Sequence, residues 1–125
     1  MAFHLEKQKT ASTPYILIDE EKGYMKIEGR SFHENILVFF KEINDWLELY
    51  LVSDFDTFTI DCELNYFNSS TAKLLLNIIL KLDEHATNHK IILNWITSET
   101  NEIVLECGED FKEEVSNLEF NIVLY

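Results

Sequence analysis

Three hydroxyl side chains stand in a row where a predicted buried strand gives way to a predicted helix. They are Ser69, Ser70 and Thr71, within the sequence YFNSSTAKLLL at residues 66–76. One hydroxyl or Asn side chain is enough to cap a helix, because a single oxygen accepts a free backbone N–H of the first turn. The surplus hydroxyls are candidates for phosphorylation. A phosphoryl group adds about −1.5 to −2 charges, and the positive end of a helix tolerates them without unfolding.

A purely structural interpretation of the same residues stays open. Asn68 or Ser69 caps the helix, and the next hydroxyls only begin its first turn. Tyr66 and Phe67 either close the core or anchor a partner protein, together with the first predicted helix. The residues predicted to contact a partner are Tyr66, Phe67, Asn68, Ser69, Ser70 and Lys73.

The chain lacks the sequence patterns of the common catalytic and metal sites. It contains neither GxGxxG nor GxxxxGK[ST], and no G-x-S-x-G surrounds the serines. His85 and His89 are four residues apart, but no acidic or thiol neighbour completes a tetrahedral metal site. Cys62 and Cys107 fit no CxxC pattern. We therefore expect a protein that is not an enzyme and that binds no metal and no cofactor.

The charge and hydropathy of the chain narrow its partners and its location. It carries 23 acidic and 10 basic residues, a formal net charge of −13, so it should repel nucleic acid and anionic lipid. No stretch reaches the roughly 20 apolar residues that span a bilayer, and no signal peptide is recognised. We expect a protein of the reducing cytoplasm that does not insert into membranes.

Strand and helix patterns alternate along the chain. Ser31 precedes Glu34 by three residues, which resembles a capping box for the first helix, whereas Gly108 weakens the prediction of the last helix. Period-two runs predict strands, and apolar stripes at helical spacing predict helices. The predicted strands are 15–19, 24–29, 57–64, 90–96 and 119–125, and the predicted helices are 34–51, 69–87 and 99–115.

This order, β-β-α-β-α-β-α-β, predicts a single α/β domain over residues 1–125 with a five-stranded mixed sheet and helices packed on it. Residues 1–13 lack sustained periodicity and are predicted to form an irregular N-terminal arm. Three helices on such a sheet leave its opposite face partly open, or available to a partner.

The topology and the hydroxyl cluster resemble the STAS-type anti-sigma-factor antagonists, which are phosphorylated on a serine at the start of the helix after the third strand. More closely, the chain resembles the SiaC family of regulatory phosphoproteins. The resembling segments are YFNSSTAKLLL at 66–76, GRSFHENILVFF at 29–40, WLELYL at 46–51, NW at 94–95 and ECGEDF at 106–111.

The resemblance implies a partner-switching regulator. It implies phosphorylation by a dedicated serine/threonine kinase, dephosphorylation by a PP2C-type phosphatase, and binding and activation of a diguanylate cyclase by the unphosphorylated form. In the family the hydroxyl directly after Tyr-Phe-Asn carries the phosphate, which is Ser69 here, with Ser70 and Thr71 as alternatives. The competing hypothesis is an unregulated scaffold or homodimer, in which the open sheet face pairs with a second copy and Ser69 is only a cap.

Overall fold

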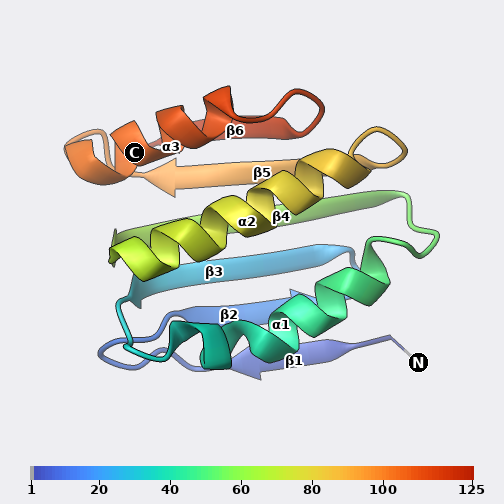
Figure 1. Ribbon diagram of the computed structural model, residues 1–125, viewed down its shortest axis with the longest axis horizontal. Coiled ribbons are helices and arrows are strands. Elements are labelled where there is room, and N and C mark those ends of the chain that lie inside the picture. Colours follow the sequence, from blue (N-terminus) through green and yellow to red (C-terminus); the bar gives the residue numbers. More distant parts are fainter. Residues whose placement is uncertain (1) are drawn as a thin grey trace.

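The computed structural model describes residues 2–125, which form one sheet and three helices (Figure 1). The order confirms the predicted alternation of strands and helices. The elements are β1 His4–Lys7, β2 Tyr15–Asp19, β3 Tyr24–Ser31, α1 Ile36–Tyr50, β4 Thr57–Phe67, α2 Ser69–His85, β5 Lys90–Thr97, α3 Glu102–Glu113 and β6 Glu119–Leu124.

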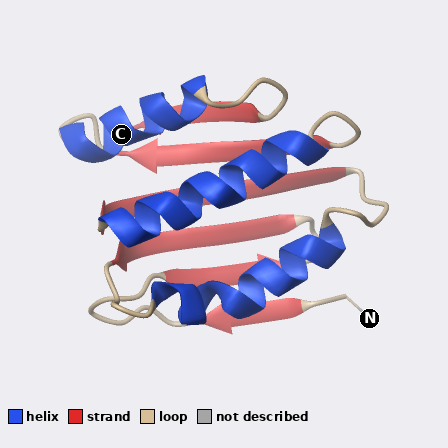
Figure 2. Ribbon diagram, viewed as in Figure 1, coloured by secondary structure: helices blue, strands red, loops and turns tan. Residues whose placement is uncertain are grey.

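The six strands lie side by side in chain order, from β1 to β6. The pairs β1–β2 and β2–β3 are antiparallel, whereas β3–β4, β4–β5 and β5–β6 are parallel. Each parallel pair is joined through one helix, and such crossovers are right-handed. Since all three crossovers advance in the same direction along the sheet, α1, α2 and α3 cover the same face of it (Figures 1 and 2). Within residues 2–125 the opposite face carries no helix.

The sheet has one strand more than the five predicted, because residues 4–7 are not part of an irregular arm. They form β1, with Leu5 opposite Ile18 and Lys7 opposite Ile16. Four residues are too few to display a period, so the strand is specified by its pairing with β2 rather than by its own sequence. On the open face, the hydroxyl of Tyr15 donates a hydrogen bond to Glu6 at 2.5 Å.

The predicted capping box at the first helix is wrong. Helix α1 begins at Ile36, after Asn35, whose side chain makes no capping hydrogen bond. Ser31 is instead the last residue of β3, where it pairs with Phe67 of β4, and its side chain is fully buried. The predicted ends of the helices are wrong by up to three residues, because local spacing fixes a boundary poorly.

The core lies between the sheet and the helices. Trp95 of β5 is almost completely buried, and its indole N–H donates a hydrogen bond to the Val104 carbonyl of α3 at 2.9 Å. The same ring lies against Gly108: a Cβ added there would be 2.4 Å from the indole Cδ1. The glycine that weakened the helix prediction is therefore what lets α3 approach the tryptophan.

We predict that Gly108→Ala destabilises the protein, although Ala is the better helix former. The added methyl group overlaps the indole ring, and overpacking of a core costs about 1–3 kcal/mol. Glu109→Ala, an exposed change at the next position, is the matched control and should leave the free energy of unfolding nearly unchanged. Urea unfolding followed by tryptophan fluorescence measures both variants, and a Gly108→Ala protein as stable as wild type would contradict this packing.

Candidate functional site

The candidate site is the corner where β4 ends and α2 begins. Asn68 is the residue between the two elements and is the N-cap of α2, because its side-chain oxygen accepts the Thr71 N–H at 3.0 Å. Its own N–H donates to the Ser31 carbonyl at the end of β3, at 3.1 Å. The capping role that the sequence left open between Asn68 and Ser69 therefore belongs to Asn68, and the Ser69 hydroxyl is not needed for it.

The three consecutive hydroxyls have two different environments. Thr71 is fully buried; its hydroxyl donates to the Ser31 carbonyl at 3.0 Å and lies 2.9 Å from the Ser31 hydroxyl. Ser69 and Ser70 are exposed on the first turn of the helix. A modifying enzyme can therefore reach Ser69 and Ser70, whereas Thr71 serves to attach the helix to β3.

The segment that begins at this corner differs in charge from the whole chain. No Asp or Glu occurs between residues 65 and 82, whereas Lys73 and Lys81 do, and the first turn of α2 carries no acidic residue. The N-terminal end of a helix also has the positive end of its dipole and free N–H groups. A dianionic group on Ser69 would therefore meet favourable electrostatics within the folded protein.

The two aromatic residues of the corner point in different directions. Phe67 is half-buried and packs edge-on against Trp95, with ring centroids 6.0 Å apart. Tyr66 is 48% exposed, and the exposed Lys73 lies one turn into α2. Of the residues predicted to contact a partner, Tyr66, Ser69, Ser70 and Lys73 thus present a surface, whereas Asn68 and Phe67 mainly hold the corner together.

Sequence reasoning missed two neighbours of Tyr66. Arg30, at the end of β3, pairs in register with Tyr66, and its guanidinium carbon lies 5.5 Å from the Tyr66 ring centroid. The same guanidinium lies 5.2 Å from the ring centroid of Phe32. Arg30 and Phe32 precede Tyr66 by 36 and 34 positions in the chain, so only the pairing of β3 with β4 brings them together. The only feature of the sequence that could have drawn attention to Arg30 is that it is the one arginine of the chain.

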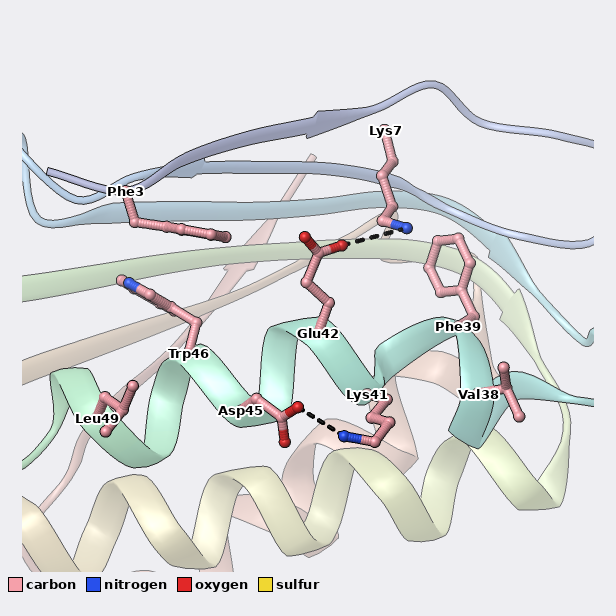
Figure 3. A pocket seen from close by; sticks show the side chains of 9 residues that line it. All are labelled: Phe3, Lys7, Val38, Phe39, Lys41, Glu42, Asp45, Trp46 and Leu49. Carbon is pink, nitrogen blue, oxygen red and sulfur yellow. Dashed lines mark hydrogen bonds and ion pairs between the residues drawn. The ribbon is translucent and has the colours of Figure 1, made fainter.

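A second surface feature lies between β1 and α1. A cavity of about 510 Å³ is lined by apolar and charged side chains, with Phe3 facing Trp46 (Figure 3). Two ion pairs border it, Lys7–Glu42 at 3.7 Å and Lys41–Asp45 at 2.7 Å. The outer side of α1 also exposes large apolar residues. The residues lining the cavity are Phe3, Lys7, Val38, Phe39, Lys41, Glu42, Asp45, Trp46 and Leu49.

His89 and the two cysteines have structural surroundings, and no metal site is present among the described residues. Across residues 2–125, no group of three or more His, Cys, Asp or Glu side chains is placed to hold a metal ion. The His89 ring stacks on Phe55, with centroids 4.1 Å apart. Burial raises the pKa of the Cys62 thiol to about 12 and that of Cys107 to about 11, which keeps both protonated and poorly nucleophilic. Among the described residues, no helix has the length and apolar character needed to cross a bilayer.

Comparison with known proteins agrees with this geometry. A family model described as "SiaC family regulatory phosphoprotein" matches residues 7–125. An uncharacterised protein of Pseudomonas aeruginosa strain UCBPP-PA14 is 33% identical over 108 residues, which cover 86% of each chain.

Solved structures of SiaC from P. aeruginosa resemble the fold over nearly its full length. One has a TM-score of 0.89 at 29% identity and covers 98% of this chain and 99% of the other. Another similar chain is in the crystal structure of the diguanylate cyclase SiaD of P. aeruginosa in complex with its activator SiaC. Its TM-score is 0.90 at 31% identity, with 97% of this chain and 99% of that chain covered.

The fold, the exposed hydroxyls at the start of α2 and the family match are those of a small α/β regulatory protein. The chain belongs to the SiaC family of regulatory phosphoproteins. The family and the mixed α/β fold predicted from the sequence are thereby confirmed.

We predict that Asn68→Ala and Ser69→Ala differ in their effect on stability. Asn68→Ala removes the cap of α2 and should lower the free energy of unfolding by about 1 kcal/mol. Ser69→Ala alters an exposed hydroxyl that caps nothing and should change it by less than about 0.5 kcal/mol. Urea unfolding of both variants tests the assignment, and equal losses of stability would mean that Ser69 shares the capping role.

Proposed function

We propose that this protein is a partner switch of the cytoplasm, controlled by phosphorylation of Ser69. In its unphosphorylated form it binds and activates a diguanylate cyclase. A serine/threonine kinase phosphorylates Ser69 and ends this binding, and a PP2C-type phosphatase restores it. Membership of a family of regulatory phosphoproteins supports this function, as does the likeness to a chain in the complex of SiaD with its activator.

One observation carries the assignment to the exposed hydroxyls of this corner, of which Ser69 is one. Asn68 caps α2, and Thr71 attaches the helix to β3. The Ser69 side chain makes neither of these hydrogen bonds and is exposed on the first turn of α2. Ser70 is also exposed, and it is the alternative acceptor. We place the phosphate on Ser69 because that residue directly follows Tyr-Phe-Asn, which is the position that the family resemblance implies.

Phosphorylation at this position should change binding without unfolding the domain. The phosphoryl group adds about −1.5 to −2 charges, which the helix N-terminus accommodates. The same charge inside an interface must lose its water, and a buried charge without a partner costs several kcal/mol. An interface that covers Ser69 is therefore stable only when Ser69 is unmodified.

The surface that binds the cyclase includes this corner and α1. Tyr66 offers a half-exposed ring, and Lys73 adds a positive charge. Along α1 the exposed apolar side chains Leu37, Val38 and Leu49 are more than two-thirds exposed and provide area to bury. Exposed apolar groups of this extent are typical of interaction surfaces.

A homodimer through the open sheet face is the competing hypothesis, and the charges of that face oppose it. Asp61 lies there, joined to Tyr24 at 2.7 Å and to Asn94 at 2.9 Å. Glu28 and Glu63 are neighbours on adjacent strands of the same face. Pairing two copies would bring these carboxylates together in a chain of net charge −13, and like charges at close range repel.

We predict that Ser69 is the phosphoacceptor in the native cell. Wild type, Ser69→Ala and Ser70→Ala are incubated with extract containing the native kinase, and phosphate is located by peptide mass spectrometry over residues 66–73. Wild type and Ser70→Ala should be modified on Ser69, whereas Ser69→Ala should remain unmodified.

Other outcomes of this experiment are equally clear. Modification of Ser69→Ala to the wild-type extent, with the phosphate on Ser70, would refute the site and keep the switch. No phosphate on this peptide in any variant, nor in wild-type protein isolated from cells under several growth conditions, would refute the switch and leave the scaffold hypothesis.

A further inference from the structure

Arg30 occupies an unusual position for the only arginine of the chain. Its guanidinium lies within cation–π distance of two rings, 5.2 Å from the Phe32 centroid and 5.5 Å from the Tyr66 centroid. The two rings also meet edge-on, with centroids 5.7 Å apart. Arg30 takes part in none of the four ion pairs between residues 2 and 125. We call Arg30, Phe32 and Tyr66 the arginine corner.

The backbone places the arginine corner at the C-terminal ends of β3 and β4, the edge of the sheet at which α2 begins. The β3–β4 register shifts between Gly29 and Arg30, so Gly29 pairs with Leu64 but Arg30 pairs with Tyr66. Gly29 has a φ of +115°, which favours glycine at this position. Ser31 directly follows Arg30, and its carbonyl accepts a hydrogen bond from the Asn68 N–H. Arg30 is thus one residue from the anchor of the corner on β3, and Tyr66 is three residues before Ser69.

The segments that carry the arginine corner contain no acidic residue, although Glu28 and Glu63 pair at the neighbouring positions of β3 and β4. Neither residues 29–33 nor residues 65–82 contain an Asp or Glu, although the chain has 23 of them. Lys73 is exposed on the first turns of α2, and the helix N-terminus adds partial positive charge. In a protein of net charge −13, Arg30 is thus an exposed positive charge that no ion pair between residues 2 and 125 neutralises.

The chemistry of a stacked arginine specifies which anionic group fits. Aromatic rings hold the plane of the guanidinium and limit its freedom, while its edge keeps the N–H groups available. That edge matches the two oxygens of a carboxylate, and Arg and Tyr are the residues that most often dominate interfaces. We propose that the arginine corner docks an Asp or Glu side chain of the target protein. This inference rests on the proposed function, because it names the chemistry of the partner at the same corner.

The charge of the arginine corner also explains why phosphorylation would weaken binding rather than strengthen it. Arg30 contributes one positive charge to the arginine corner, whereas a phosphoryl group on Ser69 supplies about two negative ones. After phosphorylation the corner no longer attracts a carboxylate. The acidic side chain of the partner then no longer meets a net positive charge. The phosphoryl group also obstructs the interface sterically.

The test compares charge, geometry and position in three variants. Arg30→Gln removes the charge, Arg30→Lys keeps the charge without the planar fork, and Lys90→Gln removes one exposed charge from the N-terminal end of β5 as the control. The probe is a purified full-length diguanylate cyclase of the organism that makes this protein. Each such cyclase is titrated with unphosphorylated wild type, and one that binds is used. Circular dichroism establishes that each variant is folded.

Arg30→Gln should bind the cyclase about tenfold more weakly than wild type, because a hydrogen-bonded charge pair is lost. Arg30→Lys should fall between the two, and Lys90→Gln should match wild type. The affinity of Arg30→Gln should also depend less steeply on salt concentration than that of wild type.

Each other result overturns a different claim. If wild type binds none of the cyclases, the proposed function fails and this inference fails with it. If wild type binds and folded Arg30→Gln binds equally well, the proposed function stands and the carboxylate dock is refuted. If Arg30→Gln differs from wild type only when Ser69 is phosphorylated, then Arg30 contacts the phosphoryl group within the same chain and not the partner.

Discussion

The backbone carbonyl of Ser31 is the point on which the functional corner depends. It accepts two hydrogen bonds, one from the Asn68 N–H and one from the Thr71 hydroxyl, and the Ser31 hydroxyl lies 2.9 Å from that of Thr71. Ser31 and Thr71 are buried, and a buried polar group without a partner costs about 1–3 kcal/mol. The three residues therefore hold the end of β3 and the start of α2 in one fixed arrangement, in which Ser69 faces outward.

The parallel topology makes this attachment available. Because β3 and β4 run in the same direction, their C-terminal ends lie together, and the helix that follows β4 starts beside the end of β3. The helices occupy one face of the sheet (Figure 2), and the end of β4 also contacts the start of α3, because the Asn101 side chain donates a hydrogen bond to the Asn65 carbonyl at 2.9 Å. A phosphoryl group on Ser69 meets the solvent and the helix N-terminus, and its charge acts on a partner rather than on the core.

The sequence was sufficient for features whose signal is local, and insufficient for features that pair distant residues. The alternation at 57–64 and the apolar stripe of α2 each repeat over several positions, so both elements were predicted correctly. Strand β1 is too short to show a period, and Ser31 resembled a cap because its true partner, Thr71, is 40 residues away. The hydroxyl cluster pointed to the corner, but only burial separates Thr71 from Ser69 and Ser70, and only strand register brings Arg30 to Tyr66.

The central claim is that the charge state of Ser69 decides whether the target is bound. It is tested most directly with two otherwise identical preparations, one unmodified and one carrying phosphoserine at position 69 in every molecule, each titrated into a purified diguanylate cyclase of the same organism. Binding and cyclic dinucleotide formation are measured together. The account predicts that the unmodified protein binds and activates the cyclase, whereas the phosphorylated protein stays folded and binds at least about tenfold more weakly. Equal binding and equal activation by the two preparations would contradict it.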